Sequence, residues 1–456
     1  MAIIYLYGPP ASGKTTLGRR LAEALSWDFT DLDAEIVAHE GREIKDIFAK
    51  DGEKAFRLME GEALARVTLN AKTSTVIALG GGTLLDDANR AFASEKGKIW
   101  CLDTPSKEEV ARRIAAGGDT RPLGDMSAAR AAHYASFPSR VAASFYLPGS
   151  LVVVGCALGD PRDFAPLVIA DSTAASLHGV GGEKVFTIPS GEERKNLETV
   201  ASIWRAFHSR GIGRRDMVAA FGGGVTGDLT GFAAATWMRG VPWINFPTTL
   251  LSMVDASTGG KTGCDLPEGK NLVGAFHAPR LVVIDSSRLS TLPARELRGG
   301  RAEMIKHDII AGRDNGLANP IPSPIEIADN LSVKVGIVRE DPFERTGRRI
   351  LLNCGHTVGH ALEIATGFAV SHGEAVAIGC VEEARLAVRL GLASAEWPER
   401  LAARFADAGL PTALPEGFTF DSLAPLMRGD KKRYGSSVTF ALPCGPGDVR
   451  PIPCQL

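Results

Sequence analysis

A chain of 456 residues is longer than one hydrophobic core usually serves, so we expect two or three domains. Its 51 Lys and Arg residues nearly balance 53 Asp and Glu, and 45% of all residues are hydrophobic. This is the composition of an ordinary soluble globular protein, and it excludes the strongly basic surface that nucleic-acid or anionic-membrane binding requires.

The cysteines and the apolar runs indicate the compartment. Seven cysteines are scattered along the chain without a Cys-x-x-Cys pair. This spacing favours reduced thiols and a cytoplasmic location. No apolar run approaches the ~18 residues of a membrane span, so no membrane partner is expected.

The first 25 residues follow the order strand, glycine loop, helix. Residues 2–7 (AIIYLY) are a continuous apolar run, as in a strand buried on both faces. GPPASGKT follows and matches GxxxxGK[ST], and leucines then recur every four residues. This is the context of a phosphate-binding loop, in which Lys14 reaches the β/γ-phosphates and the Thr15 hydroxyl ligates Mg²⁺. The predicted ATP-binding residues are Ala11, Ser12, Gly13, Lys14, Thr15 and Thr16.

Polar motifs follow this loop. In DFTDLDAEI, Asp31 and Asp33 lie two apart at the end of an expected strand. Alternate strand positions point the same way, so both carboxylates are expected to face the phosphates; a solvated acidic loop is the alternative. Further on come Phe56-Arg57, the run VIALGGG, and DTRPL, which contains Arg121.

Residues 1–148 resemble shikimate kinase through GPPASGKT, DLD, FR, GGG and TRPL in this order. The resemblance implies a nucleoside-monophosphate-kinase-like P-loop domain with a parallel sheet, which phosphorylates shikimate with ATP and Mg²⁺. The segment RPLGDMSAARAAHY is shorter than is usual in the family, so Arg130 is the expected second substrate arginine and Arg140 its rival. The implied roles are shikimate binding for Asp33 (also catalytic), Arg57, Gly81 and Arg130, assistance to Mg²⁺ for Asp31, and lid closure over ATP for Arg121.

A second unit is expected after Pro148-Gly149, where the apolar run SLVVVG begins. Gly222, Gly224 and Gly227 form GxGxxG between an apolar strand and an Ala-rich helix. The acidic residue expected about 20 positions further on is missing. The pattern therefore favours a bound pyrophosphate but not a standard Rossmann unit.

Lysines beside glycines follow this motif. Lys261 lies in TGGKTG and Lys270 in GKNLVG, with Asp255 and Asn271 nearby. Such lysines suit a phosphorylated or carboxylated ligand. Two exposed surface lysines are the alternative.

The stretch NCGHTVGHALE places His356 and His360 four residues apart, on one face of an expected helix. Glu303, in a helical segment with Lys306, would complete with His356 and His372 the two-His, one-carboxylate set of a catalytic zinc site. Two core histidines satisfied by their neighbours are the alternative. The pair lacks the Glu of HExxH, which argues against a metalloprotease.

Residues from about 150 onward resemble 3-dehydroquinate synthase through PSGEERKN, GGGVTGDLTGFAAAT, PTTLLSMVDASTGGKTG, GKNLVGAFH, AEMIK, LLNCGHTVGHALE, HGEAVAIG and GDKK. The resemblance implies an NAD-binding α/β part (150–290) and a helical metal- and substrate-binding part (291–456), together residues 149–456. It also implies the cyclisation of 3-deoxy-arabino-heptulosonate 7-phosphate (DAHP) to 3-dehydroquinate with loss of phosphate. NAD is reduced and reoxidised within each turnover, and the metal is Zn²⁺ or Co²⁺.

The resemblance assigns the remaining residues. For NAD they are Asp171, Ser190, Gly191, Glu192, Lys195, Gly224, Val225, Thr226, Gly227, Asp228, Thr248, Thr249, Lys261, Lys270, Arg288, Leu289, Ser290 and Thr291. For DAHP they are Asp255, Lys270, Asn271, Lys334, Lys431 and Arg239, the last across a homodimer interface formed by this half. Lys261, Lys306, His360, Arg349 and Asn353 are implied to be catalytic, as is Lys14 of the first unit.

The sequence therefore predicts a fused shikimate kinase and 3-dehydroquinate synthase, with shikimate, ATP and DAHP as small-molecule substrates. One alternative is a kinase of another small acceptor joined to a different sugar-phosphate cyclase or a polyol dehydrogenase. Another makes the first unit a nucleotide-binding regulatory module. The prolines of AGRDNGLANPIPSPIEIADN, where the family would be helical, predict a trimmed helical part.

Overall fold

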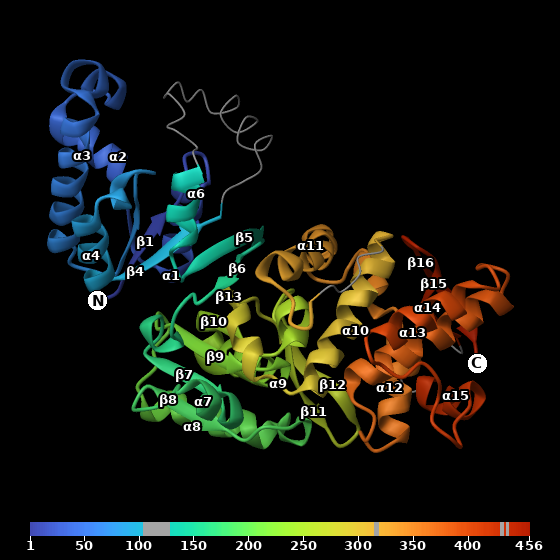
Figure 1. The fold of residues 1–456 in the computed structure, drawn as a ribbon. Coiled ribbons are helices and arrows are strands. Elements are labelled where there is room, and N and C mark those ends of the chain that lie inside the picture. Colours follow the sequence, from blue (N-terminus) through green and yellow to red (C-terminus); the bar gives the residue numbers. More distant parts are fainter. Residues whose placement is uncertain (104–127, 314–318, 429–432, 435–436) are drawn as a thin grey trace.

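The computed structural model describes residues 1–103, 128–313, 319–428, 433–434 and 437–456. The molecule is elongated, and its two termini lie at opposite ends (Figure 1). One sheet of eleven strands runs through it in the order β2-β3-β1-β4-β5-β6-β13-β10-β9-β7-β8. Within the described ranges no helix has the length and apolar character needed to span a membrane.

The N-terminal part of this sheet is parallel and is formed by five strands. The apolar run of residues 3–7 forms a fully buried central strand, and Leu17, Leu21 and Leu25 bury one face of the following helix, as predicted. The strands are β1 (Ile3–Tyr7), β2 (Asp28–Asp31), β3 (Thr75–Ala78), β4 (Lys98–Leu102) and β5 (Arg140–Leu147). The helices are α1 (Lys14–Leu25), α2 (Leu32–Glu40), α3 (Ile44–Asn70), α4 (Asp87–Lys96) and α6 (Ala128–Ala135).

The strand β5 joins the N-terminal part to the rest of the sheet. It pairs in parallel with β4 at Leu102 and Val141, and antiparallel with β6 (Ser150–Cys156) over its whole length. Pro148 and Gly149 form the turn of this hairpin, with Gly149 in the left-handed region at φ 73°. The expected division at residue 148 therefore falls on the turn of a hairpin.

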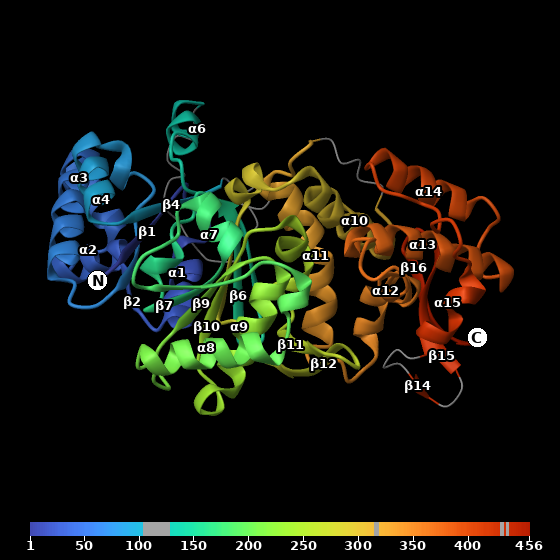
Figure 2. The same ribbon diagram turned by 90° about the horizontal axis from the view of Figure 1, so that it is seen from below.

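The middle part continues the sheet with five further parallel strands beside β6. Helices cover it, and a separate antiparallel hairpin extends toward the C-terminal helices (Figure 2). The strands are β7 (Leu167–Asp171), β8 (Val185–Ile188), β9 (Val218–Gly222), β10 (Trp243–Pro247) and β13 (Leu281–Asp285), with β11 (Lys261–Leu266) and β12 (Gly269–Phe276) in the hairpin. The helices are α7 (Ser172–His178), α8 (Leu197–Ser209) and α9 (Gly224–Thr236).

The C-terminal part is mainly helical, as the resemblance implied, and ends on a small antiparallel sheet. In the proline-containing segment after Lys306, no described helix is broken by a proline. Pro324 lies in the first turn of α11, where proline is favoured, and Ser323 and Glu326 form a capping box. The helices are α10 (Ala294–Ala311), α11 (Pro324–Glu340), α12 (His356–Ala365), α13 (His372–Arg389), α14 (Trp397–Asp407) and α15 (Phe420–Arg428). The strands are β14 (Arg433–Tyr434), β15 (Ser437–Gly445) and β16 (Asp448–Gln455).

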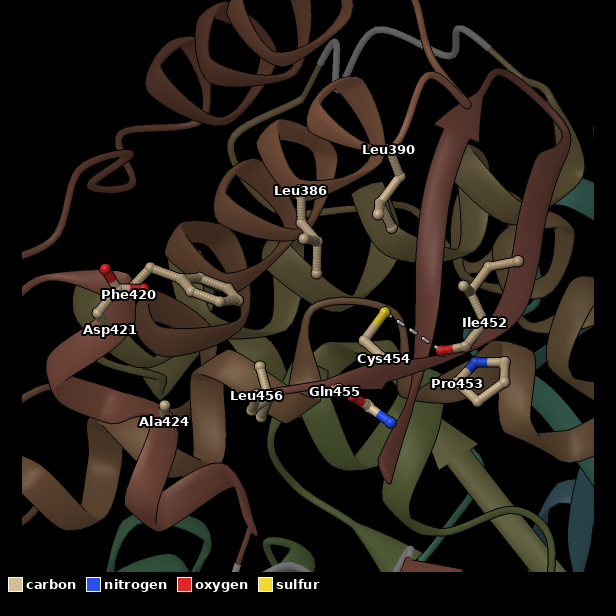
Figure 3. A pocket seen from close by; sticks show the side chains of 10 residues that line it. All are labelled: Leu386, Leu390, Phe420, Asp421, Ala424, Ile452, Pro453, Cys454, Gln455 and Leu456. Carbon is tan, nitrogen blue, oxygen red and sulfur yellow. Dashed lines mark hydrogen bonds between the residues drawn. The ribbon is translucent and has the colours of Figure 1, made fainter. Parts of the chain in front are cut away.

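A pocket of about 360 Å³ opens between α13, α15 and β16. Its wall is mostly apolar, and the side chains that line it include Leu386, Phe420 and Ile452 (Figure 3). None of the predicted site residues lines it. The predicted chemistry lies elsewhere in the molecule.

Candidate functional site

The glycine loop between β1 and α1 has the geometry of a phosphate cradle. Gly8 (φ 139°) and Gly13 (φ 95°) adopt left-handed backbone, which a side chain would disfavour. No side chain caps α1, so its first N–H groups remain available to an anion. The Lys14 ammonium lies over the loop and donates to the carbonyls of Gly8 (3.0 Å) and Pro9 (2.8 Å).

The two aspartates predicted beside the phosphates lie on different elements. The strand β2 ends at Asp31, whose carboxylate accepts from the Thr15 hydroxyl (2.7 Å) and caps α2. Asp33 lies in the first turn of α2, so the expectation that both stand on one strand is wrong. Asp33 nevertheless faces the GGG loop, because a Cβ added to Gly80 would lie 3.2 Å from its Oδ1.

Arg57 lies against the same loop. A Cβ at Gly82 would lie 2.2 Å from its Nη1, and this nitrogen also donates to Glu60 Oε2 (2.5 Å). Glu60 is 1% exposed and accepts from the Thr83 hydroxyl (2.8 Å). Burial raises the pKa of Glu60, and the adjacent Arg57 opposes this shift.

The structure separates the two rival arginines. On α6, Tyr134 donates its hydroxyl hydrogen bond to the Gly81 carbonyl (2.7 Å), and Arg130 lies one turn before it. Arg140 lies on β5, where its Nε donates to Asp103 (2.8 Å). This placement favours Arg130 as the substrate arginine. Arg121 lies outside the described residues.

The residues predicted to bind NAD, except Lys261 and Lys270 on the hairpin, gather at one edge of the sheet. Each group follows the carboxyl end of one of five parallel strands, the position at which open α/β sheets bind ligands. Asp171 ends β7, residues 190–195 follow β8, residues 224–228 follow β9, Thr248 and Thr249 follow β10, and residues 288–291 follow β13.

Three polar contacts connect these groups with one another and with the hairpin. The Ser190 hydroxyl donates to Asp171 Oδ1 (2.8 Å). The Lys195 ammonium, 7% exposed, binds Asp228 (2.6 Å) and donates to Asn271 Oδ1 (2.6 Å). Burial opposes the charge of Lys195, but the carboxylates of Asp228 and Glu192 raise its pKa above the usual value. Gly223 supplies no side-chain cap to α9, so the N–H groups of the GxGxxG turn are available to a pyrophosphate.

Asp255 connects this edge to the helical part. It lies in a single π-helical turn (Ser252–Ala256) and binds Lys306 through Oδ2 (3.0 Å). Lys334 donates to the Asp255 carbonyl (2.6 Å) and also contacts its Oδ1. Burial alone would raise the pKa of Asp255, but the two ammonium groups hold it well below its usual value.

Glu303, His356 and His372 form the predicted metal cluster. Glu303 Oε1 lies 3.2 Å from His372 Nε2 and 3.5 Å from His356 Nε2, and the three ligand atoms lie within 4.8 Å of one another. Two ligands of one tetrahedral Zn²⁺ lie about 3.3 Å apart when each bond is about 2.0 Å long, so the residues fit the ion.

The tautomers also suit a metal. His356 donates from Nδ1 to the Cys354 carbonyl (3.1 Å), which leaves Nε2 facing Glu303. Burial, with help from Lys306, lowers the pKa of His356 well below its usual value, so this ring is neutral. Burial opposes the charge of His372, but its contacts with Glu303 and Glu363 raise its pKa to about 10. The His360 ring lies 5.3 Å from that of His356 between centroids, on the predicted face.

Comparison with known proteins covers most of the chain. The family models "3-dehydroquinate synthase N-terminal" and "3-dehydroquinate synthase C-terminal" match residues 185–299 and 300–433, and "Shikimate kinase" matches residues 10–141. The 3-dehydroquinate synthase of Symbiobacterium thermophilum is 42% identical over 312 residues, which cover 63% of this chain and 87% of the relative. The chain belongs to the 3-dehydroquinate synthase family. A shikimate kinase unit precedes the synthase in the same polypeptide.

Further relatives agree with this assignment. The 3-dehydroquinate synthase of a Synechococcus species is 47% identical over 278 residues, covering 58% of this chain and 75% of the relative. A 2-deoxy-scyllo-inosose synthase solved with carbaglucose-6-phosphate, NAD⁺ and Co²⁺ is 27% identical, with TM-score 0.58 over 69% of this chain and 97% of that one. The 2-epi-5-epi-valiolone synthase of Streptomyces hygroscopicus, solved with NAD⁺ and Zn²⁺, is 28% identical, with TM-score 0.58 over 69% and 95%.

Other predicted residues of the synthase half are not members of the Glu303, His356 and His372 cluster. Lys261 is half exposed and binds Glu344 (2.6 Å). Arg349 is buried and donates to the carbonyls of Gly259 and Pro342 (both 3.0 Å), and Asn353 is the last residue of the same short helix (Arg348–Asn353). Arg239 is exposed beyond the C-terminal end of α9, opposite the GxGxxG turn. Lys431 lies outside the described residues.

Two buried carboxylates of the synthase half were not predicted. Glu363 binds both Lys270 and His372, and Glu383 accepts from the N–H groups of Gly355, Thr357 and Val358. Glu363 follows His356 by seven residues, a helical spacing that would have placed it on the same face. Glu383 has no such signal, because it reaches α12 from a different helix.

Proposed function

We propose that this chain is a bifunctional enzyme that phosphorylates shikimate with ATP and cyclises DAHP to 3-dehydroquinate with release of phosphate. The observation that carries the proposal is the largely buried Glu303, His356 and His372 cluster beside Lys306. Asp255 links Lys306 to the strand ends where the residues predicted to bind NAD gather. A polyol dehydrogenase would need the metal and NAD but not this set of lysines. The synthase relatives, at 42% and 47% identity, favour DAHP over the substrates of other cyclases.

In the kinase unit, the loop N–H groups and Lys14 hold the phosphates of ATP, and Thr15 with Asp31 holds Mg²⁺. Mg²⁺ held there would supply positive charge that offsets the negative charge of the transferred phosphoryl group. Asp33 accepts the proton of the attacking hydroxyl, and Arg57 with Arg130 binds the shikimate carboxylate. Glu60 fixes the Arg57 guanidinium against the glycine loop, which keeps the carboxylate site in place.

In the synthase unit, NAD⁺ supplies a transient hydride acceptor, and Zn²⁺ or Co²⁺ held by the cluster supplies a Lewis acid. Lys270 and Lys334 bind the phosphate and carboxylate of the substrate. In support, the Lys270 ammonium lies between Glu192, after β8, and Glu363, beside the cluster, and Lys334 binds Asp255, after β10. His360 lies beside the cluster and transfers protons near neutral pH. Asp255 orients Lys306 and Lys334.

The proposal includes the organisation of the molecule. Residues 1–148 form the kinase unit, 150–290 the NAD-binding part and 291–456 the metal-binding part, with β5 shared at the boundary. A cytoplasmic homodimer forms through the synthase half. Arg239 supports the dimer, because its side chain is exposed beyond the end of α9 that lies opposite the GxGxxG turn. Its backbone is left-handed, with φ 68°. Size-exclusion chromatography with light scattering tests the dimer.

The experiment measures two activities of the intact chain. ADP formation is followed with and without shikimate, and phosphate release is followed with DAHP, NAD⁺ and Zn²⁺. Lys14→Ala is expected to abolish only the first, and His356→Ala only the second, so each variant is the control for the other. If shikimate stimulates no ADP formation while ATP still binds, the first unit has another acceptor or a regulatory role. If DAHP releases no phosphate, the synthase assignment fails.

A further inference from the structure

A buried carboxylate that the proposed mechanism does not use touches both the metal cluster and a substrate lysine. Glu363 is 4% exposed, and its two oxygens face different partners. Oε2 lies 3.4 Å from His372 Nδ1, and Oε1 lies 3.2 Å from Lys270 Nζ. Packing alone does not explain this, because each oxygen of one carboxylate meets a different functional group.

The contact to His372 selects one side of the ring. Nδ1 faces Glu363, while Nε2 of the same ring faces Glu303 at 3.2 Å. A hydrogen bond from Nδ1 fixes the neutral tautomer whose Nε2 lone pair points at a metal, and it raises the basicity of that nitrogen. His356 is held in the same way through its own Nδ1, by the Cys354 carbonyl.

The contact to Lys270 crosses between the two parts of the synthase. Lys270 stands on β12, in the hairpin of the NAD-binding part, and its ammonium also binds Glu192 (3.2 Å). Glu363 belongs to α12 of the metal-binding part. The carboxylate therefore fixes the distance between a metal ligand and a lysine that binds substrate.

We propose that Glu363 is a positioning residue of the synthase, which orients His372 toward the metal through Oε2 and holds Lys270 through Oε1. The proposal rests on the proposed function, because it needs the metal site formed by Glu303, His356 and His372. It predicts that the charge and acceptor capacity of residue 363, and not its volume, set the affinity for Zn²⁺.

The test measures Zn²⁺ affinity of the metal-free full chain by competition with a chromophoric chelator. Glu363→Gln keeps an acceptor but loses the charge, and it is expected to weaken Zn²⁺ binding about 10-fold. Glu363→Met keeps the volume without an acceptor, and the expected loss is about 100-fold. Glu382→Gln is the matched control, because this carboxylate of α13 binds Arg385 and no residue of the cluster. Shikimate kinase activity of each variant and its thermal unfolding midpoint report whether the chain is folded.

A second measurement separates the two contacts. Lys270→Met is expected to raise the KM for DAHP and leave Zn²⁺ affinity within about twofold of wild type, since Lys270 touches no ligand atom. Equal Zn²⁺ affinity in wild type, Glu363→Gln and Glu363→Met would overturn the proposal. A loss in Glu363→Met with none in Glu363→Gln would assign the role to hydrogen bonding alone and overturn the role of charge. If wild type itself binds no Zn²⁺, the metal site of the proposed function fails, and this assignment fails with it.

Discussion

At the scale of single residues, the synthase site contains buried charged side chains that are stabilised by ion pairs with one another. Asp255 receives both Lys306 and Lys334, and the Lys306 side chain is 1% exposed. Removal of one member of a buried ion pair leaves an uncompensated charge, which typically costs about 3–5 kcal/mol. Asp255 therefore supports both the fold around the site and the position of the two ammonium groups.

Asp255→Asn is expected to lower the free energy of unfolding of the synthase half by about 3 kcal/mol and its kcat at least 100-fold, because both lysines lose their counter-charge. Differential scanning calorimetry and phosphate release measure these effects. The exposed Asp163→Asn is the control. An unchanged unfolding midpoint would contradict the importance of this ion pair.

His307 predicts a pH dependence of stability. It is fully buried and donates a hydrogen bond from Nδ1 to Asn330 Oδ1 (2.9 Å). Burial, with the Lys306 charge, lowers its pKa from 6.5 to about 4. Between pH 6.5 and 4 the unfolded chain therefore binds a proton that the folded chain does not. Stability is full above pH 6.5 and falls as the pH drops toward 4, by up to roughly 3 kcal/mol.

Urea unfolding of the synthase half at several pH values, followed by fluorescence, measures this dependence. His307→Gln is expected to be less stable at pH 7 but to show a flatter profile between pH 6.5 and 4. The exposed His39→Gln should retain the wild-type profile. If all three profiles are parallel, His307 does not titrate as described.

At the scale of elements, the pair α12 and α13 carries the two histidines of the proposed metal cluster, and α10 carries its glutamate. His356 is the first residue of α12 and His372 the first of α13. Gly355 precedes α12 and offers no side-chain cap, so Glu383 of α13 takes this role for three N–H groups (2.7–3.3 Å). A carboxylate at a helix N-terminus is favoured by the helix dipole as well as by these hydrogen bonds.

Glu383→Ala is expected to lower the free energy of unfolding by about 2 kcal/mol and to weaken Zn²⁺ binding, because the start of α12 carries His356. Thermal unfolding and chelator competition measure the two effects. Glu383→Gln, which keeps one acceptor oxygen, should recover part of both. A loss of stability with unchanged Zn²⁺ affinity would show that the cap does not position His356.

At the scale of the whole molecule, the two enzymes share one sheet and one core. The strand β5 pairs with β4 of the kinase and with β6 of the synthase. A single buried cluster includes Leu21 and Trp100 of the kinase with Val153 and Phe164 of the synthase, and Trp27 stacks on Phe164 at 6.0 Å. Trp100 also donates to the Leu158 carbonyl (2.9 Å). The kinase unit therefore depends on the synthase to bury one of its faces.

We expect a chain of residues 1–148 to be insoluble or partly unfolded, because it exposes the apolar face that α1 and β4 bury in the full chain. In the intact protein, urea should abolish kinase activity and unfold the NAD-binding part in one coincident transition. Circular dichroism of the truncated chain and activity of the full chain measure these outcomes. A soluble, active fragment would show that the shared core is dispensable.

The sequence by itself determined the local elements and their chemistry. The strand, glycine loop and helix around Lys14, the GxGxxG turn after β9, and the histidines at i and i+4 all follow from spacing and residue type over fewer than 20 positions. Family resemblance extended this to both activities. Local sequence patterns did not assign every element correctly. Asp33, for example, lies on a helix and not on the expected strand.

Only the tertiary structure decided which distant residues meet. It placed Arg130 one turn before Tyr134, which contacts Gly81, and placed Arg140 on β5 against Asp103. It also brought Glu363 between His372 and Lys270 and paired β5 with strands of both units. These contacts join residues up to 93 positions apart. The physical reason is that strand pairing and buried charge pairing depend on the whole arrangement of the core, which no local pattern of residues encodes.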